Sequence, residues 1–94
     1  MREEFKPVYE KFIEVYGIKS QMRMCIEEMS ELTKELCKLE RNWDTAKRQE
    51  IENNIREEIA DVLNMAEQLE YFFGEEEIEK IRKYKIDRSL KRDF

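Results

Sequence analysis

The sequence contains no histidine, and this absence removes several kinds of catalytic and metal site. A Ser-His-Asp triad, a Cys-His dyad, a histidine-liganded zinc site and a Glu-x-x-His di-iron site all need that residue. Any chemistry must come from carboxylates, amines, guanidinium groups, amides, hydroxyls or the two thiols. With only two glycines and one proline, the chain also has few tight turns, which argues against a sandwich or barrel of many short strands.

Long apolar runs and an excess of positive charge are missing as well. No stretch approaches the ~20 apolar residues of a membrane span, and the first residues are too charged for a signal peptide. The net charge of −5 argues against general binding to nucleic acid polymers. Cys25 and Cys37 fall in one predicted helix about 18 Å apart, beyond disulfide reach. We therefore expect reduced thiols in a cytoplasmic protein without a membrane or nucleic acid partner.

Helical periodicity dominates what is present. Apolar residues recur at steps of three and four, which predicts an all-α protein with a single domain over residues 1–94. We expect a helical bundle of about four helices, with the second and third forming a central antiparallel hairpin. A chain this short gains core by pairing with copies of itself. The predicted helices are a first one ending at Gly17, a second from residue 18 or 20 to about 41, a third from about 46 to 73, and a fourth after Gly74.

Two acidic segments look alike at an offset of thirty residues. Each contains a pair of acids three residues apart, and such residues point to the same side of a helix. At ~100° per residue, the first acid of each pair borders the apolar sector of its helix and the second flanks it on the same side. The pairs are Glu28 with Glu31, and Glu58 with Asp61.

The register of a symmetric hairpin brings these two pairs together. The numbers 28 and 61, and likewise 31 and 58, share a midpoint between Asp44 and Thr45, where the apolar pattern breaks. When two antiparallel helices are related by a two-fold axis, residues on the equivalent flank of each helix lie on the same side of the pair. The sequence therefore predicts four carboxylates at one level on one side of the hairpin.

Four close carboxylates raise one another's pKa values unless a counter-charge is present. A divalent cation supplies it, and all-oxygen ligands favour Mg²⁺, with Mn²⁺ possible, over zinc or copper. The implied reaction class is metal-assisted attack of water on a phosphoanhydride. The alternative is a charged structural bundle, because a chain with 23 acidic residues produces many acidic pairs that only solvate a helix.

These segments resemble a known family. Glu28-Met29-Ser30-Glu31, followed by Glu58-Ile59-Ala60-Asp61 after a helical spacer, is similar to the motif of the MazG-like nucleoside triphosphate pyrophosphohydrolases. This all-α superfamily includes dimeric dUTPases and phosphoribosyl-ATP pyrophosphohydrolase. The resemblance covers residues 18–73 well and the C-terminal helix more loosely. It implies hydrolysis of a nucleoside triphosphate to the monophosphate and pyrophosphate with Mg²⁺, in a homodimer or homotetramer.

Carried onto this chain, the resemblance implies that the four acids hold the metal and perform catalysis, with Glu27 as another candidate to orient the water. It also implies substrate contacts from Asn64, Gln21, Lys85 and Arg88, each with an ordinary surface role as the alternative. Nothing in the sequence identifies the nucleotide. Further candidates are Lys34, Lys38 and Arg41 for phosphate contacts, and Trp43, Tyr71, Phe72 and Phe73 for stacking on a base.

Two further hypotheses compete with an enzyme. The chain can be a helical adaptor or oligomerisation module whose acids only solvate it. It can also be a degenerate family member that binds a nucleotide without hydrolysing it, although the intact motif acids count against this.

Overall fold

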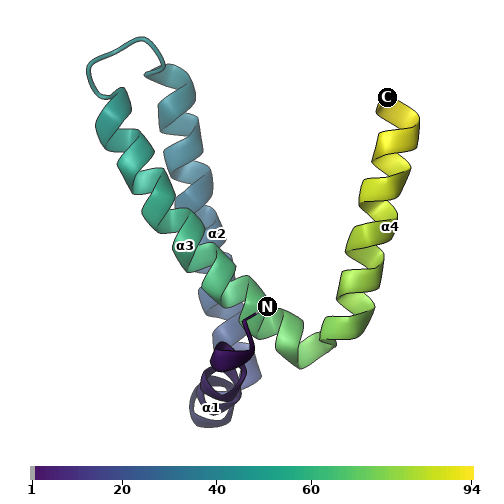
Figure 1. The fold of residues 1–94 in the computed structure, drawn as a ribbon. Helices are drawn as coiled ribbons and strands as arrows, with labels where there is room; N and C mark the ends of the chain where they lie inside the picture. Colours follow the sequence, from purple (N-terminus) through teal and green to yellow (C-terminus); the bar gives the residue numbers. More distant parts are fainter. Residues whose placement is uncertain (1) are drawn as a thin grey trace.

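The protein is all-helical. The computed structural model describes residues 2–94, and these form a short 3-10 helix, η1 (Glu3–Phe5), and four α-helices (Figure 1). The helices are α1 (Lys6–Tyr16), α2 (Ile18–Arg41), α3 (Arg48–Phe73) and α4 (Glu75–Asp93). The predicted all-α class with about four helices is confirmed. None of these helices combines the length and the apolar character needed to cross a membrane.

Helix α1 begins with proline in its first turn and ends at a glycine. Pro7 lacks a backbone N–H, which an N-terminal turn leaves without an intrahelical partner in any case. Gly17 adopts a φ of 85°, and its N–H donates to the carbonyl of Ile13 at 2.8 Å. The chain therefore turns sharply into α2. Helix α1 packs across both α2 and α3, with Tyr9 buried and its hydroxyl donating to Glu67 in α3 at 2.5 Å.

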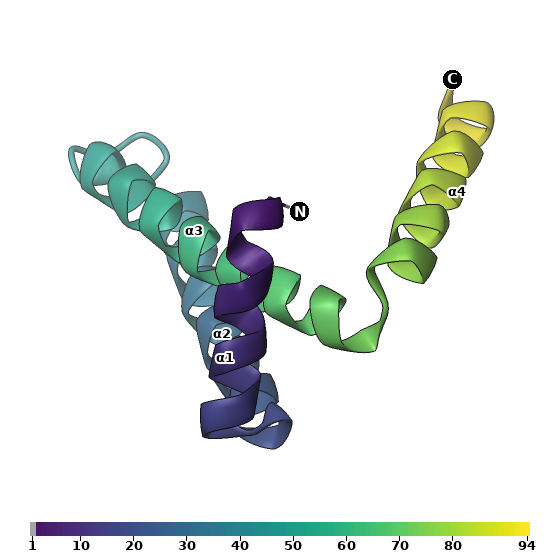
Figure 2. The ribbon, with the colours of Figure 1, turned by 60° about the horizontal axis from the view of Figure 1, so that its bottom comes forward.

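Helices α2 and α3 form the largest contact of the molecule and lie side by side in both views (Figures 1 and 2). Residues 42–47 connect them. Helix α3 starts two residues later than the periodicity predicts, because residues 45–47 still belong to the turn, where the hydroxyl of Thr45 accepts a hydrogen bond from the Lys47 N–H at 3.2 Å. The side chains of Cys25, Ile51 and Ile55 are buried between the helices.

Helix α4 leaves the other helices. Gly74 has a φ of 117°, and α4 then extends away from α2 and α3 (yellow-green in Figures 1 and 2). Within residues 2–94, α4 packs against α3 alone, although Lys6 in α1 forms a 2.9 Å ion pair with Glu75 at its start. From residue 79 onward every side chain is exposed except the half-buried Ser89.

Candidate metal centre and neighbouring pocket

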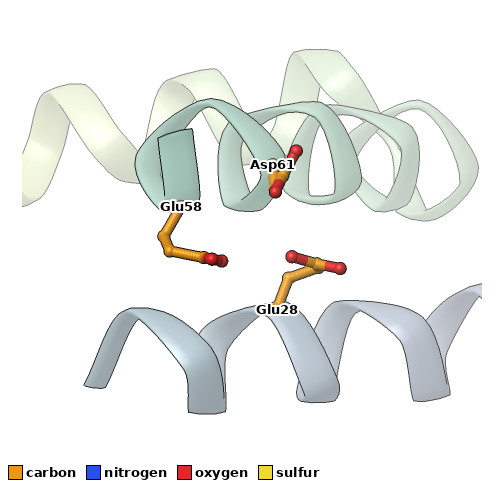
Figure 3. Close-up of side chains that lie close together, drawn as sticks. All are labelled: Glu28, Glu58 and Asp61. Atoms are coloured by element: carbon orange, nitrogen blue, oxygen red, sulfur yellow. The ribbon is translucent and has the colours of Figure 1, made fainter. Parts of the chain in front are cut away.

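Three of the four predicted acids meet across α2 and α3. Glu28 projects from α2 towards Glu58 and Asp61 of α3 (Figure 3). One carboxylate oxygen of each residue lies within 4.8 Å of the other two. Glu58 and Asp61 are three residues apart and so share one side of α3, opposite the half-buried Glu28. The structure thus brings together residues that lie thirty and thirty-three positions apart in the sequence.

The electrostatics of this cluster disfavour three ionised carboxylates. Burial raises the pKa of Glu28, and the negative charges of Asp61 and Glu58 raise it further. Burial also raises the pKa of Glu58, with Asp61 and Glu31 adding to the effect. Within residues 2–94, no lysine or arginine forms an ion pair with any member of the cluster. The described residues therefore supply no ion-pair partner to these three groups.

The donor set fits a hard divalent cation. Oε2 of Glu58 is buried and has no hydrogen-bond partner among the described residues, which is costly for a carboxylate oxygen. A cation among the three side chains would satisfy that oxygen and remove the mutual repulsion. Carboxylate oxygens are the ligands that Mg²⁺ and Mn²⁺ accept in proteins, usually together with water and phosphate oxygens.

Glu31, the fourth predicted ligand, lies outside the group of three. Its side chain is exposed, yet it is near enough for its charge to raise the pKa of Glu58. Glu35, one turn further along α2, is buried and also raises the pKa of Glu58. Its Oε1 accepts from Lys38 at 3.2 Å, whereas its Oε2 has no partner among the described residues. The sequence reasoning missed Glu35, although its four-residue spacing from Glu31 was a usable signal.

An apolar pocket of about 470 Å³ lies one helical turn from the carboxylates. Met24 precedes Glu28 by four residues and Asn64 follows Asp61 by three, so the pocket continues the same side of α2 and α3. Aromatic residues of the first helical segment form much of its wall, a role that the sequence reasoning did not assign to them. The lining comprises Phe5, Val8, Tyr9, Phe12, Tyr16, Ser20, Gln21, Met24, Asn64, Met65 and Gln68.

Two of the predicted substrate residues, Gln21 and Asn64, line this pocket. Gln21 is 3% exposed, and its Nε2 donates to Oε1 of the buried Gln68 at 2.6 Å. The Oε1 of Gln21 is buried without a partner among residues 2–94. The pocket thus combines amide side chains with aromatic rings in its lining, a combination that suits a flat, polar-edged ring.

The other two predicted substrate residues, Lys85 and Arg88, are exposed on α4 and do not line the pocket. Lys38 pairs with Glu35, while Lys34 and Arg41 are exposed. None of the four aromatic residues first considered for base stacking lines the pocket. Trp43 instead lies under the Arg48 guanidinium at 3.6 Å, Tyr71 donates to Glu10 at 3.2 Å, and Phe72 packs edge-on against Phe73.

Comparisons with known protein families, with curated proteins and with solved structures find no match to this chain.

Proposed function

We propose that the protein is a Mg²⁺-dependent nucleoside triphosphate pyrophosphohydrolase, with Mn²⁺ as a second usable metal. The observation that carries the proposal is the convergence of Glu28, Glu58 and Asp61, with one carboxylate oxygen of each within 4.8 Å of the others. The unpartnered Oε2 of Glu58 supports a cation at this place. The resemblance of the two acidic segments to the MazG-like motif supplies the reaction class.

In the proposed reaction, water adds to the α-phosphorus and the bond to the bridging oxygen breaks. The products are a nucleoside monophosphate and pyrophosphate, and the proton of the attacking water passes to a carboxylate. Bound Mg²⁺ would neutralise the phosphate charge and lower the pKa of the attacking water. Glu28, Glu58 and Asp61 would hold the metal. Glu31, which is exposed, would orient the water or complete the ligand set, with Glu27 as the other candidate for orienting the water.

The pocket beside the carboxylates gives the substrate its second point of attachment. A nucleobase is flat and carries hydrogen-bonding groups on its edges, so it matches the aromatic wall and the amides of Gln21 and Asn64. One helical turn, about 5–6 Å, separates the pocket from the carboxylates. This spacing would allow a base to occupy the pocket while its phosphates reach the metal.

The proposal also covers the helical hairpin, the domain organisation, the location in the cell and the oligomeric state. We take α2 and α3 as a central antiparallel hairpin in a single domain, acting in the cytoplasm as a homodimer or homotetramer. Lys85 and Arg88 would then contact phosphates only where the arrangement of copies brings α4 near a carboxylate cluster.

The decisive experiment incubates the purified protein with a panel of ribo- and deoxynucleoside triphosphates and Mg²⁺ and measures released pyrophosphate. We expect release from at least one nucleotide, abolished by Glu28→Gln and by Asp61→Asn. Glu40→Gln, an exposed acid elsewhere on α2, is the matched control and should keep full activity. Absence of pyrophosphate with every nucleotide, or full activity in both site variants, would refute the proposal.

A second candidate function is a non-enzymatic helical adaptor, which the exposed helix α4 favours. An adaptor function does not require a cation bound among the carboxylates. Thermal melting with and without Mg²⁺ therefore separates the two candidates, because a cation bound only to the folded state raises the melting temperature.

A further inference from the structure

The isolated chain exposes more surface than a folded protein of its size. Its accessible surface is 7614 Å², whereas a compact monomer of 11.6 kDa exposes roughly 5,800 Å². Its radius of gyration is 16.3 Å, against roughly 12 Å for a compact domain of this length. The excess is roughly 1,800 Å², and one partner in a stable interface buries about 800 Å². The chain therefore carries enough surplus surface for a large interface.

Helix α4 is one source of the surplus. Its side chains Ile81, Tyr84, Ile86 and Leu90 are between 51% and 63% exposed. Ile86 and Leu90 are four residues apart and share one side of α4, whereas Ile81 and Tyr84 lie on another side. Because α4 packs only against α3 among the described residues, these apolar side chains join no core. Because Gly74 directs α4 away from the other helices, its own chain does not cover it (Figure 1).

The second source lies on α2 and α3, on the side opposite the carboxylates. At ~100° per residue, a stripe of apolar side chains falls 80–160° from Glu28 in α2 and from Glu58 in α3. Helix α1 covers the carboxylate side, where it lines the pocket, and leaves this stripe exposed. We call the stripe the open face; it comprises Met22, Ile26, Met29, Leu36, Ile59 and Leu63, each at least 40% exposed.

Residues 80–94 also differ from the rest of the chain in net charge. Residues 1–79 contain 21 acidic and 11 basic side chains, a net charge of −10. Residues 80–94 contain seven basic and two acidic side chains, a net charge of +5. The basic C-terminal part of α4, with its exposed apolar groups, thus extends from an acidic body with an exposed apolar face. The partner that offers both complements, negative charge and apolar surface, is a second copy of the same chain.

We propose that two copies exchange their α4 helices, each laying its α4 across the open face of the other. A two-fold axis makes the contact reciprocal, so both arms and both open faces are covered at once. This inference specifies the interface of the homo-oligomer in the proposed function, and it does not depend on metal or nucleotide. Nucleic acid is the less favoured partner for α4, because the acidic body repels it and the exposed Ile and Leu side chains gain nothing from phosphates.

The first test measures the mass of the full chain in solution by sedimentation equilibrium. We expect a dimer that weakens as NaCl rises from about 0.05 M to 1 M, since part of the attraction is between opposite charges. Leu90→Asp on α4 and Ile26→Asp on the open face should each weaken dimerisation about 100-fold, because the two-fold axis makes each substitution act twice. Val15→Asp, an equally exposed apolar site on α1, should leave the mass unchanged.

The second test identifies which surfaces touch. Dimers formed from one isotope-labelled and one unlabelled copy should show NOEs between the methyl groups of Ile86 or Leu90 and those of Met22 or Met29 across copies. A monomer at every concentration, or a dimer that keeps its affinity in Leu90→Asp and shows no such NOE, overturns the exchange. Pyrophosphate release is measured in a separate assay. A chain that dimerises through α4 but releases no pyrophosphate would refute the proposed function and leave the exchange of α4 intact. Circular dichroism verifies that the variants remain helical.

Discussion

Helices α3 and α4 are built from similar residues and have opposite surroundings. Both are rich in isoleucine and in charged side chains, over 26 and 19 residues respectively. In α3, Ile51 and Ile55 are four residues apart, fall on one side and are buried. In α4, Ile81 and Ile86 are five residues apart, ~140° around the helix, and both are exposed. Spacing alone does not decide which helix joins the core, because Ile86 and Leu90 of α4 are also four residues apart and are exposed. The difference is that α3 packs along α2, whereas α4 packs only against α3 among the described residues.

The acids of the two helices differ in the same way. Glu58 and Asp61 of α3 meet Glu28 of α2 and have no cationic partner among the described residues. On α4, Asp87 accepts from Lys83 at 2.8 Å and Glu79 from Arg82 at 2.8 Å. Acids that are paired locally with lysine or arginine only solvate a helix. Acids that converge without such partners are the ones that call for an external cation.

The largest expected effect is on stability, from truncation of a buried α3 side chain. Ile55→Ala should lower the free energy of unfolding by about 2–5 kcal/mol, because it leaves a cavity between helices. Ile81→Ala on α4 should lower it by less than about 1 kcal/mol in dilute protein. Urea unfolding at about 1 μM and 100 μM protein checks both values. A loss for Ile81→Ala that grows with concentration would show that α4 is covered by a second copy.

The next largest effect is on kcat/KM, and it distinguishes Asp61 in the carboxylate cluster from Asp87 on α4. Asp61→Asn removes a proposed metal ligand and should lower kcat/KM for pyrophosphate release at least about 100-fold, about 2.7 kcal/mol. Asp87→Asn breaks only an exposed ion pair on α4 and should change it less than about twofold. Equal losses in the two variants would contradict the assignment of the carboxylate cluster as the active site.

A smaller effect is expected on the melting temperature, which Mg²⁺ should raise only when the carboxylate cluster is intact. The raised pKa values of Glu28 and Glu58 mean that the folded state binds more protons above pH 4.5 than the unfolded chain. Their contribution to stability is therefore lost as pH rises through the raised pKa values. Mg²⁺ at ten times its dissociation constant should raise the melting temperature at pH 8 by roughly 5–10 °C, and by much less at pH 5. Asp61→Asn should lose the Mg²⁺ effect and Asp87→Asn should keep it; a Mg²⁺ shift of equal size in both would contradict the site.

The sequence predicts the helices well because α1, α2 and α3 each carry an apolar periodicity, and because Gly17, the turn at 42–47 and Gly74 mark where helices end. It also predicts that Glu28 meets Glu58 and Asp61, because a hairpin that turns between residues 44 and 45 brings residue 28 opposite residue 61 and residue 31 opposite residue 58. It does not distinguish Glu31 from Asp61, because both lie at ~300° on their helices, yet only Asp61 belongs to the group of three. The search for acids three residues apart also overlooked Glu35.

Two features were beyond sequence reasoning for physical reasons. The aromatic wall of the pocket depends on where α1 crosses α2 and α3, which tertiary packing sets, as in the contact between Tyr9 and Glu67. The direction of α4 depends on the dihedral angles of Gly74. Glycine at that position predicts the end of α3 but permits many directions for the helix that follows.

The smallest expected effect concerns the junction between the two helices compared above. Glu70 of α3 lies against Glu79 of α4, and its buried Oε1 has no hydrogen-bond partner among residues 2–94. Burial raises the pKa of Glu70, with the hydrogen bond to Glu79 adding to it, whereas that hydrogen bond and Arg82 lower the pKa of Glu79. When Glu70 is protonated, its carboxyl can donate to the Glu79 carboxylate and so join α4 to α3.

A raised pKa for Glu70 means that its stabilising contribution is complete below pH 4.5 and is lost as pH rises through the raised value. Glu70→Gln keeps a hydrogen-bond donor at every pH, so this variant should melt about 1–3 °C above the wild type at pH 8 and show little difference at pH 4. Glu76→Gln, an exposed neighbour in the first turn of α4, is the control and should follow the wild type at both pH values. If Glu70→Gln instead melts below the wild type at pH 8, the shared proton is not what joins the helices. The direction of α4 would then rest on Gly74 and on the ion pair between Lys6 and Glu75.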